Sequence, residues 1–178
     1  MQFLSSDALQ RARRIRLVIF DVDGVLTDGK LWYGPDGEEL KAFHAFDGHG
    51  VKLLLQAGLR TALITGRESP AVAERAKELS IEHVLQGVAD KRKAYEGLLR
   101  RLKVGREAAA YMGDDVVDLP VLTRAGFACA PHEAPEVVRR RVHYISSADA
   151  GHGAAREVCE FILQAQDKLD HVLRKYLR

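Results

Sequence analysis

The chain has 178 residues, 47% of them hydrophobic and 29% charged, and its formal net charge is +2. These values are typical of one soluble globular domain with a substantial core, and they argue against disorder and membrane spans. A net charge this close to zero gives no support to a nucleic-acid partner. The basic run from Arg139 to Arg141 is interpreted as a solvated helix end.

The N-terminal segment lacks the apolar core of a secretion signal, and Ser6 followed by Asp7 predicts the cap of a short helix. Cys129 and Cys159 form no CxxC motif, so neither a disulfide framework nor a zinc cluster is expected. We therefore expect two buried thiols in a cytoplasmic protein.

Predicted strands and helices alternate along the chain. Leu17 to Phe20 has no polar face, which predicts a strand buried on both sides. This alternation predicts a Rossmann-like parallel α/β sheet with helices on both faces, formed by one domain over residues 1–178. The predicted strands cover residues 16–20, 59–65, 83–86, 108–114, 126–130 and 142–146, and the predicted helices cover residues 50–57, 69–79, 90–103, 116–125, 134–140 and 154–176.

Residues 30–43 interrupt this alternation. The sequence YGPDG supplies turn residues between two extended runs, which predicts a β-hairpin that projects from the body. The other connections are too short for a separate cap domain. Leu31, Trp32 and Tyr33 make the hairpin apolar, which favours packing against another subunit. The apolar stripe of the predicted C-terminal helix fits the same role or packing on its own sheet.

Two carboxylates, Asp21 and Asp23, directly follow the first buried strand. Ionised carboxylates this close repel one another, so a cation or a shared proton is the cheapest way to keep both at the end of an apolar strand. The alternative is an ordinary Asp/Gly turn.

Further polar residues follow the other strands. Because ligands bind beyond the carboxyl ends of parallel strands, we expect these side chains to converge although they are distant in sequence. Carboxylates suit a hard divalent cation, and a hydroxyl and an ammonium group suit phosphate, so the combination favours phosphoryl transfer. The alternatives are helix caps at Thr65, Asp114 and Asp115 and an ordinary surface lysine. The residues concerned are Thr65, Gly66, Arg67, Lys91, Asp114, Asp115 and Asp118.

The sequence DVDGV at 21–25 resembles the DxDx[TV] signature of the haloacid dehalogenase superfamily. ITGR at 64–67, Lys91 and GDDVVD at 113–118 match the second, third and fourth motifs of that superfamily in order. The hairpin, FDGHGVKLL at 46–54 and GHGAAREVCE at 151–160 resemble, more narrowly, its capless phosphatases of 3-deoxy-D-manno-octulosonate 8-phosphate. Phe46 departs from that pattern, since many relatives have Arg there.

This resemblance implies a role for each residue. Asp21 would be the nucleophile, and Asp23 would act first as acid and then as base. Mg²⁺ would be held by Asp21, the carbonyl of Asp23 and Asp114. The remaining implied positions are Thr65, Gly66 and Lys91 for the phosphoryl oxygens, Arg67 for the rest of the substrate, and Asp115 and Asp118 for orienting water, metal ligands or Lys91.

The activity implied by the resemblance is magnesium-dependent hydrolysis of a sugar-acid phosphate through an aspartyl phosphate, within lipopolysaccharide biosynthesis. The resemblance also implies a homotetramer. One alternative substrate is a nine-carbon keto-acid 9-phosphate. A second alternative is a non-catalytic oligomerisation module like those appended to sugar-acid nucleotide transferases.

Overall fold

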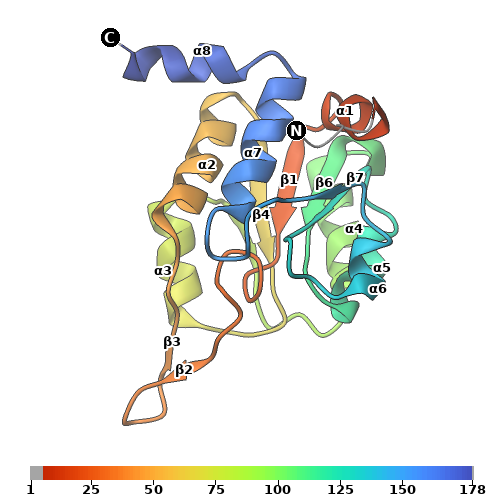
Figure 1. Cartoon of the computed structure of the whole chain (residues 1–178). Helices are drawn as coiled ribbons and strands as arrows, with labels where there is room; N and C mark the ends of the chain where they lie inside the picture. The colour runs from red at the N-terminus through yellow and green to blue at the C-terminus, as the bar shows by residue number, and fades with distance from the viewer. Residues whose placement is uncertain (1–5, 178) are drawn as a thin grey trace.

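The computed structural model describes residues 6–177 and contains one six-stranded parallel sheet. Its strand order is β5-β4-β1-β6-β7-β8, with every neighbouring pair parallel, as Figure 1 shows for the central strands. The α/β fold and all six predicted strands are thereby confirmed. The strands are β1 (Leu17–Phe20), β4 (Arg60–Ile64), β5 (His83–Leu85), β6 (Ala109–Met112), β7 (Phe127–Ala130) and β8 (Tyr144–Ile145).

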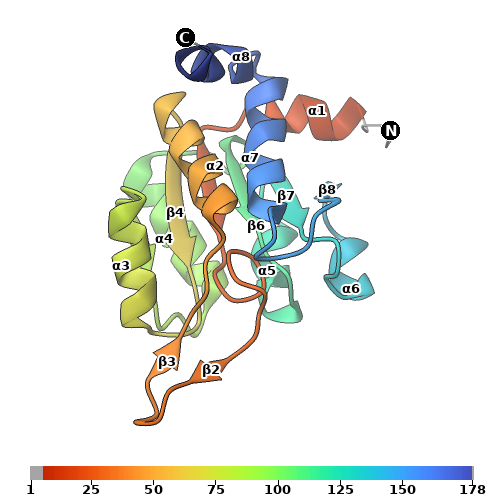
Figure 2. The same cartoon turned by 60° about the vertical axis from the view of Figure 1, so that its left-hand side comes forward.

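Helices cover both faces of this sheet because its central strands are apolar on both sides. In β1, Val18 and Phe20 point into one core, and Leu17 and Ile19 point into the other. The first core is closed by α1 (Ser6–Ala12), α2 (Ala45–Gln56), α3 (Pro70–Glu78) and α7 (Ala154–Ala165), and the second by α4 (Lys91–Leu102), α5 (Leu119–Leu122) and α6 (Glu136–Arg139). Figure 2 shows α2 and α7 side by side on one face.

The predicted hairpin is present between β1 and α2. It consists of β2 (Trp32–Tyr33) paired antiparallel with β3 (Glu39–Leu40). Gly37, with a φ of +82°, adopts the left-handed conformation in its turn. The hairpin projects from the end of the body opposite α8 (Leu169–Leu173), as both cartoon views show. It is the only insertion of this kind within residues 6–177, and no separate cap domain is formed there.

The helix predicted over residues 50–57 begins five residues earlier, at Ala45. Gly48 and Gly50 therefore both lie within α2. A Cβ atom on Gly50 would lie 3.1 Å from the Cα atom of Arg156, so the absence of a side chain lets α2 and α7 approach closely. The nitrogen Nδ1 of His44 caps the new start by accepting a hydrogen bond from the Phe46 amide at 3.2 Å.

The prediction of one C-terminal helix over residues 154–176 is wrong. α7 ends at Ala165, α8 follows, and a short 3₁₀ helix covers Arg174–Tyr176. Asp167 adopts the left-handed conformation with a φ of +56°. The amide of Lys168 donates to the Leu163 carbonyl at 2.9 Å, and the Asp167 amide donates to that of Gln164 at 3.0 Å. This Schellman pattern ends the helix.

The apolar stripe of that predicted helix packs largely on the chain's own core. Val158 and Ile162 of α7 are fully buried in the first core, and Val172 of α8 belongs to the same cluster. Of the two interpretations left open, packing on the chain's own sheet therefore holds for α7.

Two other helices are shorter than predicted, since residues 116–125 form a 3₁₀ turn followed by α5, and α6 covers only Glu136–Arg139. Within the described part of the chain, no helix has the length and apolar character needed to cross a bilayer.

Glu157 fastens the segment between β8 and α7. Its carboxylate accepts hydrogen bonds from the Tyr144 hydroxyl at 2.7 Å and from the amides of Ser147 and Ala148 at 2.9 and 3.1 Å. We expect Glu157→Ala to lower the free energy of unfolding by about 1–3 kcal/mol, because three donors lose their acceptor. Urea denaturation measures this change. Glu160→Ala, three residues along the same helix, removes only an ion pair with Arg156 and should cost less than about 1 kcal/mol. Equal losses of unfolding free energy in the two variants would contradict the role assigned to Glu157.

Candidate active site

The predicted site residues converge at the carboxyl ends of the sheet. Together with Leu31 of the hairpin, most of them line one cavity of about 510 Å³. Asp21 extends β1, Thr65 directly follows β4, Lys91 begins α4, and Asp114 lies two residues beyond β6. The lining residues include Asp21, Asp23, Gly24, Thr65, Gly66, Arg67, Lys91, Asp114 and Asp115. The structure therefore brings eight of the nine predicted positions together around this cavity, and Gly24 lines it as well. The ninth position, Asp118, is fully buried and does not line the cavity.

A buried ammonium group links two of the carboxylates. The Nζ atom of Lys91 donates to Asp21 Oδ2 at 2.5 Å and to Asp118 Oδ1 at 2.7 Å, and all three side chains are at most 7% exposed. The alternative of an ordinary surface lysine is thus wrong. Burial opposes the positive charge of Lys91, but the two aspartates outweigh that effect and raise its pKa.

Asp118 organises the turn beneath the cavity. Its Oδ1 atom also accepts from the hydroxyl of Tyr111 at 2.7 Å, and its Oδ2 atom accepts from the amides of Asp114 and Asp115 at 3.1 and 3.3 Å. Asp115 in turn caps the 3₁₀ helix Val116–Asp118 by accepting from the Val116 amide at 2.6 Å. The cap alternative therefore holds for Asp115. It does not hold for Thr65, because the N-cap of α3 is Ser69.

Gly24 leaves room for Asp114. A Cβ atom on Gly24 would lie 2.1 Å from Asp114 Oδ2, and the φ of Gly24 is +76°. Any side chain here would collide with the carboxylate as well as strain the backbone. One oxygen from each of Asp21, Asp114 and Asp118 lies within 4.8 Å of the others.

The crowded carboxylates carry more negative charge than Lys91 can balance. Burial raises the pKa of Asp21 to about 7, with Asp118 acting in the same direction and Lys91 opposing it. Burial also raises the pKa of Asp114 to about 8, with Asp118 and Asp21 adding to the effect. Across residues 6–177 the carboxylate of Asp114 forms no ion pair. A hard cation between Asp21 and Asp114 fits this donor set, which consists of oxygen atoms alone.

Asp23 is held from another direction. Its Oδ1 atom accepts a hydrogen bond from Lys41 Nζ, and its Oδ2 atom lies 4.0 Å from Arg67 Nε. Lys41 also pairs with Glu39 at 2.6 Å, and Glu39 pairs with Arg67 at 3.0 Å. These contacts join the loop after β1, the base of the hairpin and the loop after β4.

Sequence reasoning missed three contributors, namely Tyr111, Glu39 and Lys41. Tyr111 is a polar-tipped residue within an apolar strand, and such a residue usually finds a partner when buried. That signal was available in the sequence. The contact of Lys41 with Asp23 joins residues 18 positions apart through the hairpin, and no local pattern marks it.

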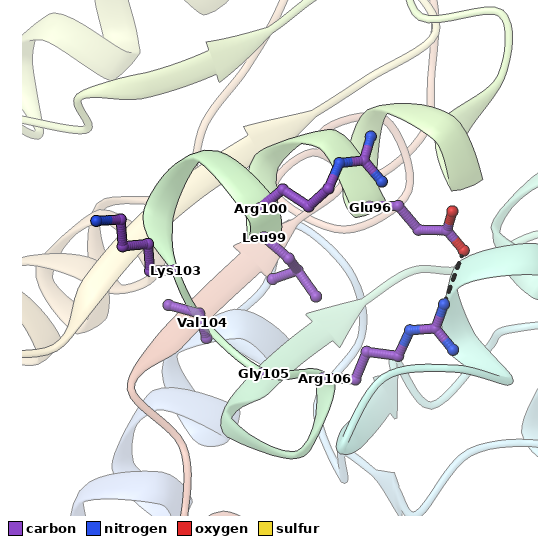
Figure 3. Close-up of a pocket in the computed structure, with 7 residues that line it drawn as sticks. All are labelled: Glu96, Leu99, Arg100, Lys103, Val104, Gly105 and Arg106. Carbon is purple, nitrogen blue, oxygen red and sulfur yellow. Dashed lines mark hydrogen bonds and ion pairs between the residues drawn. The ribbon is translucent and has the colours of Figure 1, made fainter.

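A second cavity, of about 410 Å³, lies at the other end of α4 (Figure 3). Its acidic lining residue, Glu96, is paired with Arg106 at 3.0 Å, and Leu99 and Val104 supply apolar walls. The cavity lies along the C-terminal half of α4 and the loop that follows it, and it shares no lining residue with the cavity that holds the carboxylates. It therefore contributes nothing to the chemistry described above.

The sequence is similar to those of known phosphatases. Residues 81–158 match the family model described as haloacid dehalogenase-like hydrolase. The 3-deoxy-D-manno-octulosonate 8-phosphate phosphatase KdsC of Yersinia pestis is 44% identical over 167 residues, which cover 94% of this chain and 89% of that protein.

Solved structures agree with these matches. A probable YrbI family phosphatase from Pseudomonas syringae has a TM-score of 0.96 and 48% identity, covering 98% of this chain and 99% of that one. The 3-deoxy-D-manno-octulosonate 8-phosphate phosphatase from Moraxella catarrhalis, solved with a magnesium ion, a phosphate ion and a KDO molecule, has a TM-score of 0.94 and 42% identity, covering 97% and 99%. The chain therefore belongs to the 3-deoxy-D-manno-octulosonate 8-phosphate phosphatase family of the haloacid dehalogenase-like hydrolases.

Proposed function

We propose that residues 1–178 form a single catalytic domain that hydrolyses 3-deoxy-D-manno-octulosonate 8-phosphate with the help of Mg²⁺. The observation that carries the proposal is the cavity in which Asp21, Asp23, Lys91 and Asp114 converge at the carboxyl ends of parallel strands. The non-catalytic alternative is disfavoured because every chemically required side chain is present in that cavity. A cytoplasmic location, expected from the sequence, remains a prediction.

Asp21 is the proposed nucleophile. It extends the rigid strand β1, and its Oδ1 atom is fixed by the Val22 amide at 2.7 Å. Attack of its carboxylate on phosphorus forms an acyl phosphate on Asp21 and releases the sugar alkoxide. Asp23, two residues along, protonates that alkoxide as it leaves and then accepts a proton from the water that hydrolyses the acyl phosphate.

The phosphoryl oxygens require hydrogen-bond donors around the nucleophile. Lys91 supplies a fixed ammonium group beside Asp21, and Thr65 and Gly66 supply a hydroxyl and a backbone amide from the loop after β4. Arg67 lies at the half-exposed rim, where its guanidinium group suits the carboxylate of a sugar acid. These four residues would bind the two anionic ends of the substrate.

Mg²⁺ fits the carboxylate set at the base of the cavity. Asp21 and Asp114 would hold it, with the carbonyl of Asp23 as a further oxygen ligand. When bound, Mg²⁺ supplies positive charge that offsets the negative charge on the transferring phosphoryl group. Asp118 is buried behind Lys91 and would orient Lys91 and the turn carrying Asp114.

The activity is tested by phosphate release from a panel of sugar phosphates that includes the nine-carbon keto-acid 9-phosphate. We expect the eight-carbon substrate to be preferred. Asp21→Asn should lower kcat by about four orders of magnitude or more, because an amide is a poor nucleophile. Asp28→Asn, in the same loop but paired with the exposed Lys30, should leave activity unchanged. Normal multiple turnover by Asp21→Asn would contradict the mechanism.

The raised pKa values of Asp21 and Asp114 predict a pH-dependent affinity for Mg²⁺. Below about pH 7 both groups hold protons that a cation must displace, whereas above about pH 8 both are ionised and repel one another. We expect the apparent dissociation constant for Mg²⁺ to fall by about tenfold or more between pH 6 and pH 8.5.

Calorimetric titration of the metal-free protein measures this constant directly. The folded pKa values lie above the ordinary value of 3.8, so ionisation of these groups disfavours the metal-free fold as the pH rises from about 4 to about 8. Mg²⁺ should therefore raise the melting temperature more at pH 8.5 than at pH 6. Asp114→Asn should lose most of that gain. A gain that is equal at both pH values would contradict the assigned metal ligands.

We further propose a homotetramer in which the hairpins pack against neighbouring subunits. Trp32 is 57% exposed and Leu40 is 52% exposed, and the two residues pair across the hairpin strands. Two strands of two residues each are marginally stable alone, and apolar side chains on them favour burial by another copy. The number four rests on the family resemblance.

Light scattering tests the assembly. Replacing Trp32 and Leu40 together by Gln should lower the measured mass toward that of the monomer, and Tyr33 is left unchanged. Val137→Gln, on α6 and 40% exposed, is the matched control and should leave the mass unchanged. An active wild-type monomer at assay concentration would refute the proposal.

A further inference from the structure

The proposed acid and base, Asp23, is not positioned by the sheet. It lies two residues beyond Asp21, in the turn after β1, where the amides of Val25 and Leu26 donate to the Val22 carbonyl. Its side chain is 21% exposed, unlike the nearly buried Asp21. Over residues 6–177, its ion-pair partners are Lys41 and, at 4.0 Å, Arg67.

Lys41 is unusual because its charged end is buried. Its side chain is only 2% exposed, although lysine normally keeps its ammonium group in water. Such burial is costly unless the charge is paired, and here Nζ donates to Asp23 Oδ1 and lies 2.6 Å from Glu39 Oε1. The ammonium group is therefore fixed between two carboxylates.

The position of Lys41 in the chain connects Asp23 to the hairpin. Lys41 is the first residue after β3, and Glu39 belongs to β3 itself. Glu39 also pairs with Arg67 at 3.0 Å, in the loop after β4. Asp23 is thus held by the base of the hairpin, which is itself anchored to the body of the domain.

We propose that Lys41 is a positioning residue that orients the carboxyl group of Asp23 toward the leaving group. This inference rests on the proposed phosphatase function. Proton transfer requires the donor within hydrogen-bond reach of the leaving oxygen, and a displacement of about 1 Å can cost about 100-fold in rate. A side chain on a partly exposed turn needs such a restraint more than one on a strand does.

The test compares two classes of phosphate ester. The 8-phosphate of 3-deoxy-D-manno-octulosonate releases a primary alkoxide, which needs a proton, whereas p-nitrophenyl phosphate releases a stabilised phenolate. The value of kcat/KM reports the steps up to and including departure of the leaving group. Lys41→Met should therefore lower kcat/KM by about 10- to 100-fold for the sugar phosphate and by less than about threefold for the aryl ester. Lys41→Arg should restore part of the loss.

A variant of Asp23, Asp23→Asn, shows whether Lys41 acts on the reaction through Asp23. It should show the same dependence on the leaving group, and adding Lys41→Met to it should cause no further loss, because no acid remains to be oriented. Lys30→Met is the matched control, since Lys30 lies on the other arm of the hairpin and forms an exposed pair with Asp28. The kcat/KM of this control should equal that of the wild type for both esters.

Two outcomes would overturn the inference while leaving the phosphatase function intact. One is equal loss for both esters in Lys41→Met, and the other is a full additional loss on the Asp23→Asn background. If Asp23→Asn itself loses nothing, the proposed acid and base role of Asp23 fails instead. Circular dichroism and melting temperature check the fold, and Lys41→Gln, which keeps a hydrogen-bond donor, replaces Lys41→Met should the latter not fold.

Discussion

One buried ammonium group holds the carboxylates of this site together. Lys91 lies between Asp21 and Asp118, and it is the first residue of α4, whose N-cap is Asp90. Without that charge, two carboxylates that are nearly or fully buried would face one another, and an unpaired buried charge costs about 3–5 kcal/mol. The parallel register of β1 beside β4 and β6 brings the contributing loops to one edge, so the geometry of the charges depends on the sheet.

The parts of this arrangement that follow from the sequence are those fixed by burial and by strand direction. Leu17 to Phe20 has no polar face, so it must be a central strand, and Asp21 must then lie at its carboxyl end. The same reasoning places Thr65 and Asp114 at the ends of neighbouring strands. The turn chemistry around Gly37 likewise predicts the hairpin, because the left-handed conformation there requires glycine.

The parts that sequence reasoning missed depend on contacts between distant segments. α2 begins at Ala45, and Gly50 within it lets the helix pack closely against α7, so a residue that locally disfavours a helix is used for helix packing. The predicted C-terminal helix ends early because Asp167 adopts a conformation that is uncommon for residues other than glycine. The partners of Asp23 lie across the hairpin, and their approach is visible only once the chain is folded.

The two proposed catalytic aspartates thus differ in what holds them. Asp21 is fixed by a central strand and by Lys91, and both belong to the body of the domain. Asp23 is held through Lys41 by a hairpin of two very short strands whose apolar face is exposed. A hairpin of this kind gains rigidity from any surface that covers Trp32 and Leu40. If neighbouring subunits cover it, assembly restrains Lys41 and, through it, the group that transfers the proton. Nucleophilic attack would then depend on the fold of one chain, and proton transfer would depend also on the assembly.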